Sequence, residues 1–199
     1  MNHLSKRDFF DKEARGWDDR YHQQDESEIR KLVDRFDVRP GDRVLDVGTG
    51  NGILLPHLVR RVQDKGRIIA LDFSWKMILE AAGVAKAANM CFMNACAAHL
   101  PIKDQTIDCV TCLAAFAHVG RKVMALTEMS RVLKDDGRIY ITHLMGKEEL
   151  AEHHRQAGGP VRHDILPPDS EMTEMMEKAG LKDVKIVDRP DLYLASARK

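Results

Sequence analysis

The sequence has no long apolar segment and no excess of charge of one sign. No apolar run approaches the roughly 20 residues that a membrane-spanning helix requires. The 31 lysine and arginine residues are balanced by 31 aspartate and glutamate residues, so no basic field exists to attract a nucleic acid or an anionic membrane. Residues 1–8 also lack the apolar core of a signal peptide. These absences predict a cytoplasmic chain that contacts neither a membrane nor a nucleic acid.

Cysteine is scarce, which argues against a disulfide-stabilised secreted domain. The four cysteines, Cys91, Cys96, Cys109 and Cys112, all fall in predicted core strands or just after them, a pattern that suits reduced thiols. Cys109 and Cys112 form a C-x-x-C pair, but strand residues three apart point to opposite sides of a sheet. We therefore expect both to be buried small hydrophobic residues and not ligands of one metal ion.

The most informative segment present is a glycine-rich turn within Val44–Gly52. A buried strand runs into this turn, and a helix follows over Ile53–Val62. Glycines let the backbone adopt positive φ and let a ligand approach without a Cβ in the way. The next strand, Arg67–Leu71, leads to Asp72, whose carboxylate is placed to accept hydrogen bonds from ribose hydroxyls. Because the D-x-G-x-G-x-G spacing differs from that of pyrophosphate-binding turns, a nucleoside without phosphates fits better.

Apolar runs alternate with amphipathic helices along most of the chain, which is typical of an α/β protein whose parallel sheet is covered on both faces. A helix capped by Asp25 or Ser27 should end near Phe36. The other expected elements are strands at 43–47, 67–71, 90–94, 107–112, 137–143, 184–187 and 192–197, and helices at 52–62, 74–87, 121–133, 147–157 and 169–179. The last two strands are joined only by Asp188–Asp191, which allows a hairpin but no crossover helix.

Five ordered segments resemble the class I S-adenosylmethionine-dependent methyltransferases. Val44–Gly52 is similar to the family's first motif, and Asp72–Met77 is similar to its acidic loop. Ala95–Pro101 is similar to its G-D-A-x-x-L-P segment, and Ile107–Val110 to the start of its fourth strand. Arg131–Arg138 is similar to its R-V-L-K-P-G-G turn. The resemblance runs from about residue 30 to the C-terminus and is greatest for the small-molecule branch, similar to the ubiquinone/menaquinone-biosynthesis methyltransferases.

The length of 199 residues predicts a single domain over residues 1–199. The resemblance implies that this domain is Rossmann-like, with a seven-stranded, mostly parallel sheet, a reversed last strand and helices on both faces. Residues 1–24 would be a helical cover and residues 25–199 the core. S-adenosylmethionine would bind as methyl donor at the carboxyl ends of the strands. The expected cofactor-binding residues are Asp46, Gly48, Thr49, Gly50, Gly52, Asp72, Phe73, Met77, Cys96, Ala97 and Leu113.

Each part of the cofactor has expected neighbours in this set. By resemblance, Asp46 lies near the methionine ammonium group, Asp72 binds the ribose, and Phe73 and Met77 flank the adenine. The chain departs from the family at Cys96, where an aspartate commonly accepts a hydrogen bond from the adenine amino group. A thiol is only a weak acceptor. Adenine recognition should therefore depend on the Ala97 backbone N–H and apolar packing, or on a neighbour such as His99.

Five of the nine histidines lie at or after the expected ends of the fourth and fifth strands, where the methyl acceptor should stand. They are His118, His143, His153, His154 and His163, the last followed by Asp164. Three interpretations remain open. The histidines are scattered surface residues, or one of them, His118 first, is a general base or orients the acceptor. Alternatively, His118, His143 and one of His153 and His154 converge on a metal or a metal-bearing acceptor, although no ligand motif marks a metal site. The catalytic candidates are His118, His143 and His154.

These features predict methyl transfer from S-adenosylmethionine to a small-molecule acceptor, with S-adenosylhomocysteine as product. Two alternatives stay open: an S-adenosylmethionine-binding protein without transferase activity, and a methyltransferase for a metal-bearing acceptor or a macromolecule. The neutral charge and the lack of an N/D-P-P-Y-type motif after the fourth strand argue against a nucleobase acceptor. No feature of the sequence predicts an oligomeric state.

Overall fold

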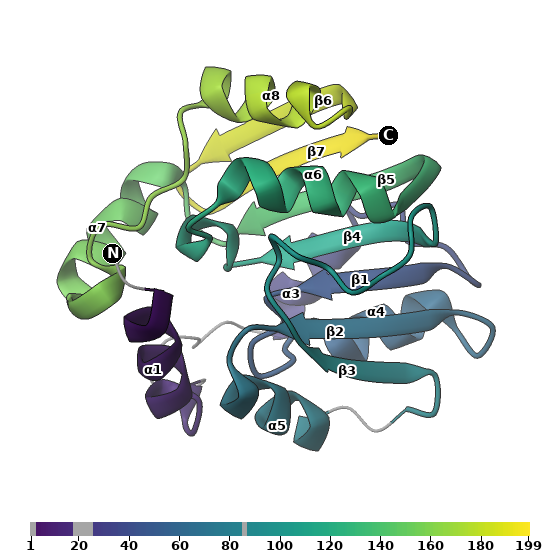
Figure 1. Cartoon of the computed structure of the whole chain (residues 1–199), viewed down its shortest axis with the longest axis horizontal. Coiled ribbons are helices and arrows are strands. Elements are labelled where there is room, and N and C mark those ends of the chain that lie inside the picture. Colours follow the sequence, from purple (N-terminus) through teal and green to yellow (C-terminus); the bar gives the residue numbers. More distant parts are fainter. Residues whose placement is uncertain (1–2, 18–25, 85–86) are drawn as a thin grey trace.

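The computed structural model describes residues 3–17, 26–84 and 87–199. Within them, seven strands form one sheet in the order β3-β2-β1-β4-β5-β7-β6 (Figure 1). The strands are β1 (Arg43–Val47), β2 (Arg67–Asp72), β3 (Met90–Asn94), β4 (Ile107–Leu113), β5 (Leu133–His143), β6 (Lys182–Arg189) and β7 (Leu192–Arg198). Neighbours from β3 to β5 pair in parallel, whereas β7 is antiparallel to both β5 and β6. The predicted mostly parallel sheet with a reversed last strand is confirmed.

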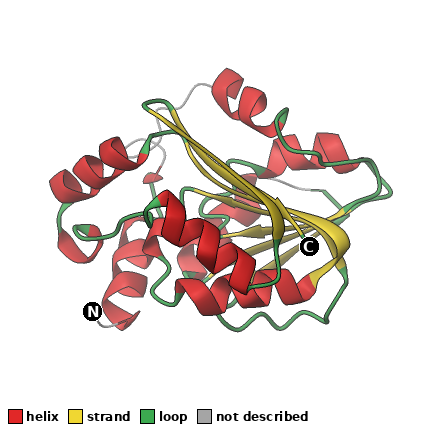
Figure 2. Ribbon diagram, turned by 90° about the horizontal axis from the view of Figure 1, so that it is seen from above, coloured by secondary structure: helices red, strands yellow, loops and turns green. Residues whose placement is uncertain are grey.

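Helices cover both faces of the sheet, as Figure 2 shows. The helices of the described residues are α1 (His3–Glu13), α3 (Glu26–Val33), α4 (Leu55–Val62), α5 (Trp75–Val84), α6 (Lys122–Val132), α7 (Lys147–Ala157) and α8 (Asp169–Lys178), with the 3-10 helices η1 (Phe116–His118) and η2 (Gly159–Val161). One buried cluster joins α6 and α8 to one face of the sheet, and a second joins α3 and α4 to the other. Because both faces of the sheet are covered, β2 is apolar without alternation from Ile68 to Leu71.

The alternation of strand faces separates Cys109 from Cys112 as expected. Cys109 packs in the cluster with α3 and α4, Cys112 packs in the cluster with α6 and α8, and both are fully buried. All four cysteines are free thiols. The expectation of a core position is wrong for Cys91, which is exposed on the edge strand β3.

Some elements begin at other residues than the sequence predicts. Helix α4 begins at Leu55 and not at residue 52, because the chain first completes a turn in which the Leu55 N–H donates to the Gly52 carbonyl over 3.0 Å. Strand β5 begins at Leu133 and not at residue 137, with an irregularity in its pairing with β4. Helix α3 begins at Glu26, so Ser27 is a helical residue and not the cap, while Asp25 lies outside the described residues.

The order of the strands reverses between β1 and β4, which opens a crevice at the carboxyl ends of the strands. Helix α1 lies beyond this end of the sheet, on the same side as α7 in Figure 1. Phe10 of α1 and Ala14, the residue after this helix, pack against Met77 of α5 and Val161 of η2. The N-terminal helix thus bridges two walls of the crevice. The later part of the expected cover, with Tyr21 and His22, lies outside the described residues.

Of the helices in the described residues, none combines the length and the apolar character that crossing a membrane requires.

Candidate cofactor site and adjoining histidine cavity

The glycine turn after β1 is held against the end of β2 by its own backbone. The N–H groups of Gly48 and Thr49 donate to the Leu71 carbonyl over 2.7 and 2.9 Å. Gly48 has a φ of +69°, and a Cβ there would lie 2.3 Å from the Ala115 Cβ. Gly50 has a φ of +56° and lines a cavity at the ends of β1, β2 and β4, which we call the main cavity. A Cβ at Gly50 would meet no protein atom within 4 Å. The turn therefore brings bare backbone to the space that a ligand would occupy, which glycine permits.

Asp72 connects the glycine turn to the start of α5. Its Oδ2 accepts the Gly50 N–H over 3.0 Å, and its Oδ1 accepts the Ser74 N–H over 2.8 Å. The cap of α5 is Ser74, whose Oγ accepts the Met77 N–H over 3.2 Å. Each carboxylate oxygen of Asp72 retains acceptor capacity, so this residue can accept both ribose hydroxyls while it holds the turn. Burial raises the pKa of Asp72 to about 6.

Replacing Asp72 by alanine should weaken S-adenosylmethionine binding by roughly 1.5–3 kcal/mol, because the ribose loses charged acceptors. The change also removes the acceptor of the Gly50 and Ser74 N–H groups, so the unfolding temperature without cofactor should fall. Titration calorimetry measures the first effect and thermal unfolding the second. The matched control, Asp72→Asn, keeps one amide oxygen and should lose affinity with a smaller loss of stability. Unaltered affinity in Asp72→Ala would remove Asp72 from the site.

Two of the expected cofactor residues, Asp46 and Gly52, do not line the main cavity. Asp46 is only 1% exposed, its Oδ1 accepts the Thr111 hydroxyl over 2.8 Å, and burial raises its pKa to about 6. Gly52 has a φ of +91°, and a Cβ there would lie 3.1 Å from the Ala81 Cα. Gly52 thus lets α5 pack against the turn. Both residues contact neighbouring elements on the side of the turn away from the main cavity, and their direct contact with a cofactor stays a prediction.

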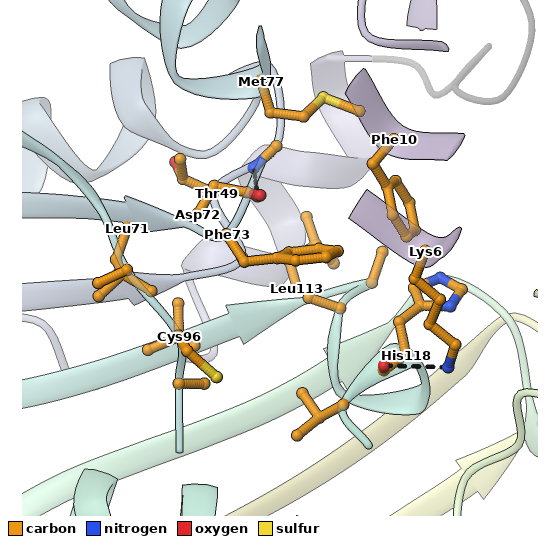
Figure 3. A pocket seen from close by; sticks show the side chains of 18 of the residues that line it. Lys6, Phe10, Thr49, Leu71, Asp72, Phe73, Met77, Cys96, Leu113 and His118 are labelled. Atoms are coloured by element: carbon orange, nitrogen blue, oxygen red, sulfur yellow. Dashed lines mark hydrogen bonds between the residues drawn. The ribbon is translucent and has the colours of Figure 1, made fainter. Parts of the chain in front are cut away.

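The main cavity lies at the ends of β1, β2 and β4, with α1 beside it (Figure 3). Its empty space, counted out to the open mouth, is about 990 Å³. The Phe10 ring of α1 lies 5.6 Å from the Phe73 ring, centroid to centroid, and closes one side. Nine of the expected cofactor residues line the cavity: Gly48, Thr49, Gly50, Asp72, Phe73, Met77, Cys96, Ala97 and Leu113.

The loop that carries Cys96 is held by two charged side chains of α6. Arg131 donates to the Leu100 carbonyl over 3.0 Å, and Glu128 Oε2 accepts the Leu100 N–H over 2.7 Å. These contacts keep Cys96 half-buried in the cavity wall. His99 is exposed and lines a separate surface depression, so it is not placed to compensate for the weak thiol acceptor.

Replacing Cys96 by aspartate should be tolerated and should tighten cofactor binding by about 1 kcal/mol, since a carboxylate accepts a hydrogen bond from the adenine amino group better than a thiol does. Calorimetric titration of the variant and the wild type measures the gain. The matched control is Cys91→Asp on the exposed edge of the sheet, which should leave affinity unchanged. Misfolding or lost binding in Cys96→Asp would show that residues 95–101 do not form the adenine wall.

A second cavity adjoins the first and gathers the predicted catalytic histidines. The two cavities share Phe10, Trp17, Ala114 and His118. The other residues that line the second cavity are Phe9, His143, Leu144, Met145, Leu150, His153, His154, Ala157 and Val161. His163, by contrast, is exposed. The structure therefore places His118 at the junction, with His143 and His154 in the cavity beyond it.

His118 is held by residues from two distant segments of the chain. Its Nδ1 lies 2.8 Å from Asp164 Oδ2, and Asp164 Oδ1 accepts the Lys6 ammonium group over 2.5 Å. Lys6 also donates to the His118 carbonyl over 3.2 Å, the dashed contact in Figure 3. The His154 Nδ1 lies 2.5 Å from the backbone carbonyl of Asp164. The sequence places Asp164 in a loop near other candidates but predicts no partner for it, and no local motif marks Lys6.

Burial favours the neutral form of both histidines. It lowers the pKa of His118, although Asp164 opposes the effect. Burial, and next the neighbouring His118, lower the pKa of His154 to about 4. For Asp164, burial opposes ionisation, but the hydrogen bonds from His118 and Lys6 outweigh it and hold its pKa below the ordinary value. The site thus combines a carboxylate with a neutral imidazole, an arrangement suited to a general base.

In the described part of the chain, no group of three or more His, Cys, Asp or Glu side chains has a geometry that could hold a metal ion. The ring centroids of His118 and His154 lie 4.7 Å apart. The Nδ1 atoms of both rings, however, already contact Asp164.

The sheet order, the glycine turn at its switch point and the carboxylate at the end of the next strand define a class of protein, the class I S-adenosylmethionine-dependent methyltransferases. A sequence profile of the methyltransferase domain matches residues 39–180. The chain therefore belongs to the methyltransferase-domain family.

Individual relatives agree with this assignment. The ubiquinone/menaquinone biosynthesis C-methyltransferase of Vibrio parahaemolyticus is 31% identical over 193 residues, covering 79% of this chain and 73% of the relative. Its counterpart from Teredinibacter turnerae is 37% identical over 108 residues, covering 52% and 43%. The crystal structure of a methyltransferase from Aquifex aeolicus is 25% identical, with a TM-score of 0.69 over 88% of this chain and 99% of that one. The chain spans about half the length of several curated relatives, between 43% and 47%.

Proposed function

We propose that the protein transfers the methyl group of S-adenosylmethionine to a small-molecule acceptor and releases S-adenosylhomocysteine. The observation that carries this proposal is the junction of the two cavities at His118. Nine of the eleven expected cofactor residues line the main cavity, and the second cavity has its own apolar walls. An acceptor in the second cavity would meet the methyl group at this junction. All four cysteines are free thiols, which suits the reducing cytoplasm that we include in the proposal.

The second cavity favours a neutral acceptor with a flat ring. Among the described residues that line it, none is lysine, arginine, aspartate or glutamate, and the walls are aromatic, aliphatic and imidazole side chains. A carboxylate or phosphate group on the acceptor would lose its hydration there without gaining a cation. The names of the bacterial relatives refer to C-methylation in quinone biosynthesis. Methylation of a ring carbon activated by a hydroxyl group is therefore the form of the reaction that we favour.

His118 would act as the general base of this reaction. The nucleophilic atom of the acceptor forms a bond to the methyl carbon while the carbon–sulfur bond breaks in line, and the electron pair stays on sulfur. The proton that the acceptor loses passes to the neutral His118 ring. The cofactor supplies the activated methyl group, and the rest of the protein aligns the two reactants and excludes water.

The test is formation of S-adenosylhomocysteine by the purified protein with four fractions of a cell extract: neutral apolar metabolites, charged metabolites, nucleic acids and proteins. The neutral apolar fraction should support turnover, and His118→Gln should abolish most of it. Turnover with the nucleic acid or protein fraction alone would replace the proposal by a macromolecular methyltransferase. Tight S-adenosylmethionine binding without turnover in any fraction would favour a binding protein.

A further inference from the structure

Asp164 contacts two of the histidines that line the second cavity and the lysine beside them. Its two carboxylate oxygens contact His118 and Lys6, and its backbone carbonyl contacts the Nδ1 of His154. The side chain is buried, and the backbone N–H of Asp164 donates to the Val161 carbonyl over 2.9 Å. Every polar group of this residue therefore has a partner. A buried carboxylate with such contacts has one orientation, and it imposes that orientation on the groups bound to it.

The contact with Asp164 determines which nitrogen of His118 carries the proton. An ionised carboxylate only accepts hydrogen bonds, so the His118 Nδ1 must be protonated to donate to it. In the neutral ring, Nε2 then holds the free lone pair. Since His118 lines both cavities, this nitrogen is the one left for a proton of the acceptor. The same argument applies to the His154 Nδ1, which donates to a carbonyl.

Lys6 supplies the positive charge that a buried carboxylate requires. Its ammonium group bridges Asp164 Oδ1 and the His118 carbonyl, so it contacts both members of the pair. Lys6 comes from α1, which also places the Phe10 ring 5.1 Å from the His118 ring. The N-terminal helix therefore adds an ionic contact as well as an apolar cover to the site.

We propose that Asp164 and Lys6 are positioning residues for the methyl transfer: Asp164 holds His118 in the tautomer whose Nε2 accepts the proton, and Lys6 holds Asp164 in place. This inference rests on the proposed function of His118 as the base. Asp164 and Lys6 act through His118, and neither has to touch the reacting atoms. The role of Asp164 resembles that of the carboxylate that orients a catalytic histidine in hydrolytic triads.

Four charged or titratable groups face the His118 ring or lie close enough to affect its charge. They are Lys6 from α1, Lys122 from α6, His154 from α7 and Asp164 from the loop after η2. Asp164 favours the protonated ring, whereas Lys6 and Lys122 disfavour it. The acid limb of the turnover profile, where His118 becomes protonated and inactive as a base, should therefore move in opposite directions when Asp164 or Lys6 is neutralised.

The decisive variant is Asp164→Asn, measured in the full chain with histidine labelled by nitrogen-15. The ring signals of His118 are assigned by their loss in His118→Gln. In the wild type, Nδ1 should be protonated and Nε2 should not. In Asp164→Asn, the amide can donate to Nδ1 and the other tautomer should gain population. The turnover number should fall by about 10²-fold, less than the loss of about 10⁴-fold seen when the orienting aspartate of a hydrolytic triad is replaced by asparagine.

Two further readouts separate positioning from a structural role. S-adenosylmethionine affinity should change little in Asp164→Asn, and the acid limb of turnover should move to lower pH. Lys6→Met should also lower turnover but should move the acid limb to higher pH, because a positive charge near His118 is lost. Lys12→Met, on the exposed side of the same helix, is the matched control and should change none of these quantities.

The proposal is overturned if His118 keeps the Nδ1 proton in Asp164→Asn and turnover and its pH limb are unchanged. If Asp164→Asn fails to fold, Lys6→Met becomes the test. An acid limb of turnover at the same pH in Lys6→Met as in the wild type also overturns the proposal. Failure of the proposed function gives a different result. In that case the wild type forms no S-adenosylhomocysteine with any fraction, while the nitrogen-15 spectra still report whether Asp164 determines the His118 tautomer.

Discussion

Gly50→Val should abolish S-adenosylmethionine binding, with a loss of affinity of at least about 10²-fold. A Cβ at this position meets no protein atom within 4 Å, and Gly50 lines the main cavity, so we expect a side chain there to enter the cavity. The two additional methyl groups of valine would fill the space in which the cofactor must approach the backbone. Calorimetric titration with S-adenosylmethionine is the measurement.

Backbone strain has to be separated from this steric effect. Gly50 has a φ of +56°, and a left-handed conformation costs an L-residue about 1–2 kcal/mol, so the variant should also be less stable. Gly41 is a matched control, since it has a φ of +90°, open space around a Cβ and no place in either cavity wall. Gly41→Val should lose stability but keep its affinity. Normal binding by a folded Gly50→Val protein would show that the cofactor does not lie against this turn.

His118→Ala should lower turnover by about 10²-fold or more and leave S-adenosylmethionine affinity nearly intact, as expected for the loss of a general base. The His118 ring stands between the two cavities, and the cofactor residues belong mainly to the other walls of the first. Burial holds the pKa of this ring below its ordinary value, so the neutral base is already present at neutral pH. Wild-type turnover should fall as the pH drops through that lowered pKa, because the protonated ring has no lone pair to accept a proton.

Steady-state kinetics, a pH profile and calorimetry together test this expectation. His99→Ala is the control, because His99 is an exposed histidine outside both cavities, and it should behave as the wild type does. A larger loss of S-adenosylmethionine affinity than of turnover would make His118 a cofactor ligand. Wild-type turnover in His118→Ala would exclude it as the base and leave His143 and His154 as the remaining predicted candidates.

Local sequence patterns were sufficient for the sheet and for grouping most of the predicted cofactor residues around one cavity. Glycine spacing, buried apolar strands and the position of Asp72 are short-range features, since a turn is determined by the few residues within it. Nine of the eleven expected cofactor residues therefore line one cavity. The two exceptions have physical reasons. Asp46 accepts a hydrogen bond from Thr111 of β4, and Gly52 leaves room for Ala81 of α5. Neither contact leaves a signal in the turn itself.

The histidine side of the site depends on contacts that only the tertiary structure decides. The sequence by itself indicated histidines near the strand ends, but not which of them would meet or what would orient them. Lys6 contacts Asp164 across 158 residues of sequence, and His118 contacts Asp164 across 46. Such pairs form because α1 and the loop after η2 pack over the same crevice, and no periodicity or spacing within either segment encodes the other. The local pattern therefore determined the fold and the glycine turn after β1, whereas packing between distant segments determined the polar groups around the candidate base.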